Sequence, residues 1–149
     1  MTLAELIQHA TEAQQQAYAP YSAFQVGAAI QTVDGQVFRG CNVENASYGL
    51  TCCAERVALF SAVAAGHRTF SQLAIASKGG VVPCGACRQT LAEFAPSLPL
   101  ILIDTEMNSQ VNASLAELFP APFTFSPKDT DSPEDTDSPK DTDSPKDTD

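Results

Sequence analysis

The order of helical and extended segments along the chain predicts an α/β protein, a three-layer sandwich in which helices cover a mixed sheet. Three observations support this fold. An amphipathic helix comes first, and a β-hairpin follows it. Segments with the character of a helix, a strand, a helix and a strand then alternate. A hairpin produces antiparallel strands and a helical crossover produces parallel ones, so the sheet is expected to be mixed.

The first helix is predicted over residues 2–17, where apolar residues recur at every third or fourth position. Thr2 and Glu5 have the spacing of a capping box at the start of this helix. Pro20 lies beyond its end, because the residue before a proline avoids the helical region.

The hairpin is predicted from two runs of strand-forming residues, 26–32 and 36–43, on either side of Asp34-Gly35. An Asp-Gly pair between two such runs is a strong signal for a tight turn. The segment 44–50 that follows is expected to be a loop.

The second half of the chain alternates helical and extended segments. They are a helix over 53–65, a strand over 73–77, a helix from Pro83 to about Phe94, a strand over 100–104 and a short helix that is capped by Asn112 or Ser114 and ends at Phe119. Proline is tolerated in the first turn of a helix, which places Pro83 at the start of the third one.

The last 24 residues differ from the rest of the chain. Residues 126–149 are four hexads of the form Ser-Pro-Lys-Asp-Thr-Asp, with Glu134 replacing lysine in the second. With no apolar residue this segment cannot form a core, so it is predicted to be a disordered acidic tail behind a catalytic domain that spans 1–125. We expect it to act as a solubilising repeat; the alternative is a phosphorylated or protein-binding tail.

Charge and cysteine usage restrict the partners of this domain. The tail holds nine acids and three lysines, so residues 1–125 keep nine acids and five basic residues, a net charge of −4. A nucleic-acid partner is not expected without clustered basic residues. A membrane partner is not expected either, since no apolar run approaches roughly 20 residues. Five cysteines, an odd number, favour a reducing, cytoplasmic location.

Three cysteines and a glutamate predict a catalytic zinc site. Cys53 and Glu55 occur as Cys-Ala-Glu, and Cys84 and Cys87 as Pro-Cys-Gly-Ala-Cys. Three thiolates leave one position of a tetrahedral zinc open for water, as catalytic sites do. Each cysteine motif lies at a predicted helix start, which favours the thiolate. Glu55 is expected to move the protons of the reaction, in the pattern of zinc-dependent nucleobase deaminases.

Two arginines directly follow the ligand motifs. Arg56 and Arg88 are predicted to compensate the negative charge that three thiolates place on the metal; the alternative is that both are surface residues. The remaining cysteines, Cys41 and Cys52, are expected to be small buried residues rather than ligands.

Two further segments extend the pattern: Pro-Tyr-Ser-Ala-Phe-Gln-Val-Gly-Ala-Ala at 20–29 and Gly-Cys-Asn-Val-Glu-Asn-Ala-Ser-Tyr at 40–48. With the cysteine motifs they make residues 3–125 resemble the small cytidine deaminases. The resemblance implies zinc-dependent hydrolytic deamination of cytidine and deoxycytidine to uridine and deoxyuridine, with release of ammonia, in pyrimidine salvage. It also implies one zinc ion per subunit and a homotetramer that shares its active sites between subunits.

The resemblance assigns roles around the substrate, a small nucleoside. Phe24 is expected to pack on the pyrimidine, Asn42 and Glu44 to bind the ribose hydroxyls, and backbone groups near Ala54 to read the base. An alternating Asn-Val-Glu directs both polar side chains to one side of a strand. Phe125 is expected to reach a neighbouring subunit's pocket, with Phe123 as the competing assignment.

The sequence departs from the family pattern at two places, and other functions remain in competition. Val82 occupies a position where the family often has a small polar residue, and the linker 105–112 looks short for the family's usual final strand. One alternative is a deaminase of a modified nucleoside or nucleoside antibiotic. Two others are a non-catalytic zinc-stabilised binding module, which needs a fourth protein ligand, and a thiol redox protein built on Cys84 and Cys87.

Overall fold

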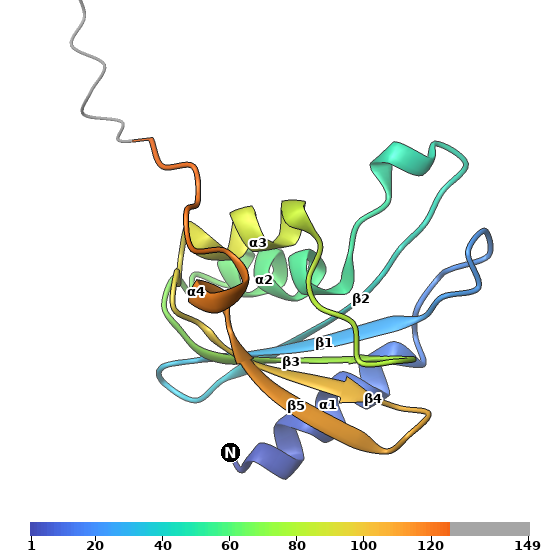
Figure 1. The fold of residues 1–149 in the computed structure, drawn as a ribbon, viewed down its shortest axis with the longest axis horizontal. Helices are drawn as coiled ribbons and strands as arrows, with labels where there is room; N and C mark the ends of the chain where they lie inside the picture. Colours follow the sequence, from blue (N-terminus) through green and yellow to red (C-terminus); the bar gives the residue numbers. More distant parts are fainter. Residues whose placement is uncertain (126–149) are drawn as a thin grey trace, which may run out of the picture.

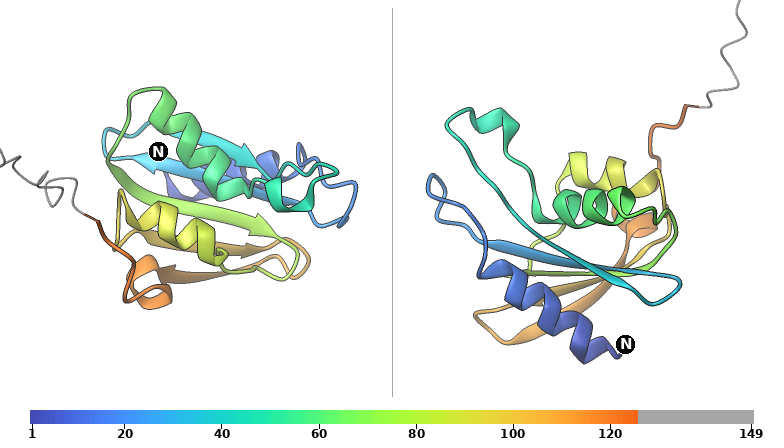
Figure 2. Two further views of the ribbon diagram at one scale, coloured as in Figure 1. Left: turned by 90° about the horizontal axis from the view of Figure 1, so that it is seen from above. Right: turned by 180° about the vertical axis from the view of Figure 1, so that it is seen from behind.

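A computed structural model describes residues 1–125 and shows a five-stranded sheet in the order β2-β1-β3-β4-β5. Helix α1 lies on one face of the sheet, and α2 and α3 lie on the other (Figures 1 and 2). The predicted three-layer α/β sandwich is therefore confirmed, whereas the predicted tail 126–149 lies outside the described residues. The elements are α1 (Leu3–Gln14), β1 (Val26–Thr32), β2 (Val37–Cys41), the 3-10 helix η1 (Tyr48–Leu50), α2 (Ala54–Ala64), β3 (Phe70–Ser77), α3 (Gly85–Ala92), β4 (Pro99–Asp104), β5 (Ser109–Ser114) and α4 (Leu115–Leu118).

The capping box predicted for the first helix is present. The Thr2 hydroxyl accepts from the Glu5 amide, and the Glu5 carboxylate accepts from the Thr2 amide. Helix α1 ends at Gln14, before the predicted end at 17, and buries Leu6, Ala10 and Ala13 against the sheet.

The hairpin forms as predicted, and two of its glycines let helices approach the sheet closely. β1 and β2 pair antiparallel around a turn in which Gly35 has φ +89°. A Cβ on Gly27 would lie 2.1 Å from the Ala10 carbonyl oxygen of α1, and one on Gly40 would lie 2.4 Å from the Ala54 carbonyl oxygen of α2. The two helices therefore contact the bare backbone of neighbouring strands from opposite faces of the sheet.

The second half of the sheet contains a parallel pair and a strand that the sequence did not predict. β3 and β4 are parallel and are joined through α3, as expected for a helical crossover. The linker 105–112 was predicted to be too short for a further strand, which is wrong: β5 occupies Ser109–Ser114 and pairs antiparallel with β4. Ser114 then caps α4, one of the two caps predicted for the last helix.

Helix α3 begins later than predicted. Its first residue is Gly85 and its N-cap is Cys84, so Pro83 lies outside the helix instead of in its first turn. Helix α2 likewise begins at Ala54 with Cys53 as its N-cap. Both helices thus begin near their predicted starts, and the N-cap of each is a cysteine.

Two apolar cores lie on the two faces of the sheet. The larger lies between the sheet and α2, α3 and α4, and includes Ile30, Leu59 and Leu91. The smaller lies under α1 and includes Leu6 and Ile101. Helices α2 and α3 pack on the same face of the sheet (Figure 1), so their cysteine caps, Cys53 and Cys84, lie on the same face as well.

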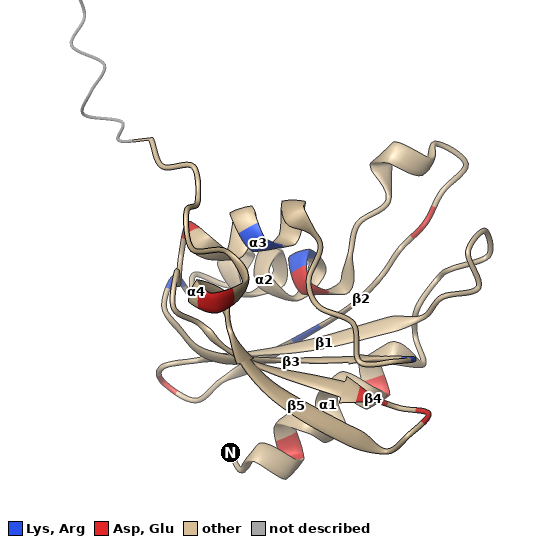
Figure 3. Cartoon of the chain, in the orientation of Figure 1, with Lys and Arg blue, Asp and Glu red and all other residues tan. Residues whose placement is uncertain are grey.

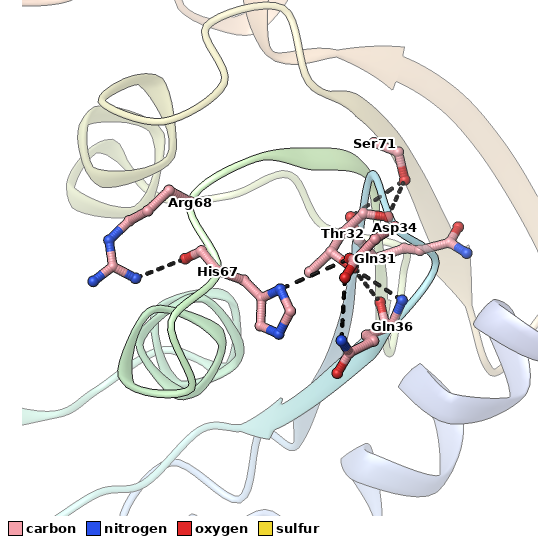
Figure 4. Close-up of polar contacts among 7 residues, drawn as sticks. All are labelled: Gln31, Thr32, Asp34, Gln36, His67, Arg68 and Ser71. Atoms are coloured by element: carbon pink, nitrogen blue, oxygen red, sulfur yellow. Dashed lines mark hydrogen bonds and ion pairs between the residues drawn. The ribbon is translucent and has the colours of Figure 1, made fainter.

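A polar cluster ties the hairpin turn to the far end of α2. His67 Nδ1 lies 3.7 Å from Asp34 Oδ1, and the Asp34 carboxylate also accepts from the Thr32 hydroxyl and from the side-chain amide of Gln36 (Figure 4). The adjacent Arg68 donates to the carbonyl oxygens of Val63 and His67, at 2.6 and 2.9 Å. This cluster fixes the C-terminal end of α2.

Basic residues are dispersed over the fold. The five that lie within residues 1–125 are on separate elements and connections (Figure 3). A basic face of the kind that follows a nucleic-acid backbone is therefore not formed in this part of the chain. None of the helices between residues 1 and 125 combines the length and the apolar character that crossing a bilayer requires.

Candidate metal centre and active site

The three predicted cysteine ligands meet between the first turns of α2 and α3. Cys53 caps α2, Cys84 caps α3, and Cys87 lies in the first turn of α3. The Cys53 and Cys84 sulfurs are 3.8 Å apart, and those of Cys84 and Cys87 are 3.5 Å apart. All three sulfurs lie within 4.8 Å of one another.

This sulfur triangle fits a tetrahedral metal ion. Zinc–sulfur bonds of about 2.3 Å at tetrahedral angles hold sulfurs roughly 3.8 Å apart, close to the separations in the cluster. Thiolates are soft ligands that favour zinc over magnesium or calcium. Cys52 is adjacent in sequence but is not one of the three residues that cluster, as predicted. Both Cys52 and Cys41 are half-buried rather than fully buried.

The surroundings of Cys53 favour its thiolate form. A hydrogen bond from Cys87, together with the nearby Arg56 guanidinium, lowers the pKa of Cys53 to about 5. The hydrogen bond that Cys87 gives, and its burial, raise the pKa of Cys87. Arg56 Nη2 lies 3.7 Å from Cys53 Sγ and donates to the Thr51 carbonyl at 3.1 Å. The structure therefore brings Arg56 into contact with a predicted ligand.

Glu55 is a buried acid beside this cluster. It lies in the first turn of α2, two residues after Cys53, and only 4% of its surface is exposed. Burial raises the pKa of Glu55 because the charged form loses its hydration. A raised pKa makes a carboxyl group a stronger base, which favours the proton transfers that general acid–base catalysis requires.

Arg88 contacts carbonyl oxygens, whereas Arg56 contacts a sulfur. Its Nε donates to Pro83 O at 2.7 Å, and its Nη1 donates to Leu118 O at 2.8 Å. Both arginines were predicted to compensate the charge of the thiolates. Among the hydrogen bonds within residues 1–125, Arg56 contacts a cysteine sulfur and Arg88 does not.

The two predicted ribose-binding residues hold the loop between α1 and β1. Asn42 accepts from the Val26 amide at 2.8 Å and donates to Phe24 O at 2.8 Å. Glu44 accepts from the amide of Tyr21 at 2.8 Å and from the amide and the hydroxyl of Ser22. Both side chains are more than 90% buried. They therefore fix the loop that carries Phe24, which is half-buried.

A pocket of about 290 Å³ opens beside Glu44, between this loop and η1. It is lined by Tyr21, Ser22, Glu44, Tyr48 and Thr51. Of these, only Glu44 was identified as a site residue from the sequence. Tyr21, Ser22 and Tyr48 lie inside the two motif segments, so their position was the available signal, whereas Thr51 lies outside both. A larger hollow of about 490 Å³, between α1, β2 and α2, includes none of the predicted site residues.

The remaining predicted site residues lie at the base of α2 and in the C-terminal segment. Ala54 is fully buried at the start of α2, next to Cys53. Phe123 and Phe125 are 73% and 62% exposed. The Gln89 amide holds the backbone of Phe123 through two hydrogen bonds, of 2.8 and 3.1 Å. The C-terminal segment is thereby attached to α3 with its two phenylalanines exposed.

Three clustered thiols with a buried acid beside them, on a mixed sheet covered by helices, define the class of metal-dependent hydrolytic deaminases. A family model described as the cytidine and deoxycytidylate deaminase zinc-binding region matches residues 1–100. The chain belongs to this family of zinc enzymes.

Similar proteins cover nearly the whole described part of the chain. A cytidine deaminase from Halalkalibacterium halodurans is 47% identical over 80% of this chain and 92% of its own length. One from Sporosarcina psychrophila is 44% identical over 83% of this chain and 93% of its own length. The crystal structure of cytidine deaminase from Burkholderia pseudomallei matches with a TM-score of 0.79 and 50% identity, over 83% of this chain and all of that one.

Proposed function

We propose that the protein catalyses the hydrolytic deamination of cytidine and deoxycytidine to uridine and deoxyuridine, a reaction of pyrimidine salvage. The observation that carries the proposal is the buried carboxylic acid of Glu55 beside three clustered thiols. In this reaction the oxygen of water bonds to C4 of the pyrimidine, the bond from C4 to the exocyclic nitrogen breaks, and that nitrogen leaves as ammonia.

We assign one zinc ion to Cys53, Cys84 and Cys87. When bound, zinc acts as a Lewis acid that makes water nucleophilic near neutral pH. Glu55 takes a proton from water and delivers it to N3 of the ring. It then takes the remaining proton of the new C4 hydroxyl group and gives it to the departing amine, so that C4 becomes the carbonyl carbon of the product. Arg56 stabilises the Cys53 thiolate through the 3.7 Å contact between Nη2 and Sγ and so offsets part of the negative charge of the three sulfurs.

We assign the nucleoside to the neighbourhood of the Glu44 pocket. Phe24 provides an aromatic face for the pyrimidine, and backbone groups near Ala54 contact its edge. Asn42 and Glu44 bind the ribose hydroxyls. Their hydrogen bonds with the loop use only part of their capacity within the described residues, which leaves a second N–H of Asn42 and a further lone pair of the Glu44 carboxylate for the substrate. Cytidine and deoxycytidine share the 3′-hydroxyl, which is consistent with the use of both.

Replacement of Glu55 by glutamine tests the reaction. Glu55→Gln keeps the shape of the side chain but cannot accept a proton, so kcat for cytidine should fall by about 10²- to 10⁴-fold while the zinc content stays that of the unaltered protein. Turnover is followed by the change in ultraviolet absorbance and zinc by elemental analysis. Glu93→Gln, an exposed glutamate at the end of α3, is the matched control and should be fully active. A Glu55→Gln protein with undiminished turnover would rule out the assignment.

We further propose a homotetramer in which Phe125 completes a neighbouring active site, with residues 1–125 as the catalytic domain and 126–149 as an appended tail. The exposure of Phe123 and Phe125 supports contacts with other subunits, as does that of Phe60 on α2 and Leu50 on η1. We propose the cytoplasm as the compartment, because three free thiols at the reaction centre need a reducing environment.

A further inference from the structure

Arg88 joins the main chain beside one cysteine of the cluster to the last helix of the domain. Its Nε donates to the carbonyl oxygen of Pro83, the residue directly before Cys84, at 2.7 Å. Its Nη1 donates to the carbonyl oxygen of Leu118 in α4 at 2.8 Å. Its backbone amide donates to Cys84 O at 2.9 Å. Arg88 therefore holds the carbonyl group of Pro83 and that of Cys84, which lie on either side of the bond between N and Cα of Cys84.

The two cysteines of α3 differ in what fixes them. Cys87 is fully buried, so the packing of α3 on the sheet sets its position. Cys84 is exposed and lies at the N-cap, outside the helix. With little packing around its side chain, the direction of its Cα–Cβ bond depends on the orientation of the Pro83–Cys84 peptide group. Pro83 is itself fully buried, and its carbonyl is held by Arg88.

We propose that Arg88 is a positioning residue for Cys84. It orients the Pro83–Cys84 peptide through hydrogen bonds to main-chain oxygens and so keeps the Cys84 sulfur in place to bind zinc. This inference rests on the proposed assignment of zinc to the three cysteines. It replaces the role predicted from the sequence, in which the charge of Arg88 acts on the thiolates.

The geometry explains why an arginine occupies this position. A guanidinium is planar and donates in several fixed directions, so it can serve two carbonyl groups on separate segments at once. Pro83 and Leu118 are such a pair, one before α3 and the other in α4. A lysine ammonium on a flexible stem keeps the charge but cannot reproduce this fork. A glutamine keeps one donor group and loses the charge.

Two substitutions at this position separate geometry from charge. We expect Arg88→Lys and Arg88→Gln to release zinc to a chelator faster than the unaltered protein, each by about tenfold, since supporting contacts around metal ligands typically change affinity by 10- to 100-fold. We expect neither to move the pH profile of kcat. Arg56→Gln, which removes the contact with Cys53, should move that profile.

Arg68→Gln is the matched control for loss of stability alone. Arg68 also donates to two carbonyl oxygens, those of Val63 and His67, but at the end of α2 away from the cysteines. Figure 4 shows the contact with His67. Its loss should lower the unfolding temperature without changing the rate of zinc release. Release is measured well below the unfolding temperature of each variant, with the chromogenic chelator in excess and the protein full-length and loaded with zinc.

Each outcome decides between the two roles. If Arg88→Lys releases zinc no faster than the unaltered protein while Arg88→Gln releases it faster, the charge of Arg88 is the cause and the positioning role is overturned. Unchanged release in both variants, or equal acceleration in Arg68→Gln, also overturns it. Should Arg88→Gln fail to fold, Arg88→Lys alone still separates the roles, because only positioning predicts faster release from it. An unaltered protein that binds no zinc would instead contradict the proposed function.

Discussion

Glu44 shows how a buried carboxylate can hold a loop. It accepts hydrogen bonds from Tyr21 and Ser22, and these hydrogen bonds, that of the Ser22 hydroxyl first, hold its pKa below the ordinary value. The same loop carries Phe24, whose carbonyl accepts from Asn42. In this arrangement the side chains proposed to bind the ribose also position the ring proposed to bind the base.

The protonation of Glu44 gives this loop a pH dependence with a definite sign. Because the pKa of Glu44 is depressed in the folded state, its contribution to stability is fully present above the ordinary glutamate pKa of about 4.3 and is lost as pH falls through the lower folded value. Ser22→Ala removes the strongest cause of the depression. The pKa of Glu44 should then rise toward the ordinary value, so its contribution to stability becomes smaller and is completely lost at a higher pH.

A carbon-detected NMR titration of the Glu44 carboxyl group measures this shift directly. Ser47→Ala is a suitable control, since Ser47 contacts Asn45 through its backbone amide and makes no hydrogen bond with Glu44 within the described residues. An unchanged Glu44 titration in Ser22→Ala would show that the Ser22 hydroxyl does not determine the charge state of this carboxylate.

At the scale of elements, the height of α2 above the sheet is set by a glycine. Gly40 lies beneath the first two turns of α2, where a Cβ would come within 2.3 Å of the Ala58 amide nitrogen and 2.4 Å of the Ala54 carbonyl oxygen. Both contacts are with backbone, which cannot move aside as a flexible side chain can. Since α2 begins with Cys53, Ala54 and Glu55, its distance from β2 also sets the position of the proposed catalytic residues.

Gly40→Ala should therefore affect stability and turnover together. Overpacking of this kind typically costs 1–3 kcal/mol, so we expect a loss of about that size in chemical unfolding, with a reduced kcat/KM for cytidine. Gly49→Ala serves as the control, because a Cβ at Gly49 would meet nothing within 4 Å. A Gly40→Ala protein with unaltered stability would mean that α2 can shift freely on the sheet.

Elements with strong local signals were predictable from the sequence, and those that depend on distant pairing were not. The capping box of α1 and the Asp34-Gly35 turn are local, and both formed as predicted. β5 was missed because most of its residues are polar and exposed, so it lacks an alternating apolar pattern and is defined by its pairing with β4. The start of α3 was misplaced because the helix-start preference of proline was followed, while Cys84 holds the cap.

The same distinction applies to the site. The spacing of the cysteines predicted a cluster, and the three sulfurs meet. The contacts of Arg88 could not be predicted, because one of its two acceptors, Leu118, is thirty positions away in a helix that β5 positions. The hydrogen bonds of Glu44 to Ser22 likewise depend on how the loop before β1 folds back on β2.

At the scale of the whole molecule, the exposed C-terminal phenylalanines predict active sites shared between subunits. A chain that ends at Phe125 should keep full activity. One that ends at Pro122 lacks Phe123 and Phe125 and should show a KM for cytidine raised by about tenfold or more, since burial of a phenylalanine side chain contributes about 1.5–3 kcal/mol. Both should retain zinc. The comparison also tests whether residues 126–149 are dispensable for turnover.

Mixed oligomers provide the decisive measurement. The chain that ends at Pro122 has an intact Glu55, and the full-length Glu55→Gln chain has an intact C-terminal segment. When the two are unfolded, combined and refolded, subunits that exchange the phenylalanine should recover the low KM of the unaltered protein at sites with an intact Glu55, which neither chain shows alone. Absence of recovery, with mixed oligomers demonstrated by native mass spectrometry, would place each active site within one chain.

The cysteines that cap α2 and α3 have a consequence beyond catalysis. Neither cap makes the side-chain hydrogen bond that serine, threonine or aspartate usually provides, so the first amides of both helices lack this local support. An ion bound to Cys53 and Cys84 would fasten the two helix starts together, and its departure would free both at once. Metal starvation would then expose this layer to proteolysis, and the amount of protein in the cell would follow the zinc supply.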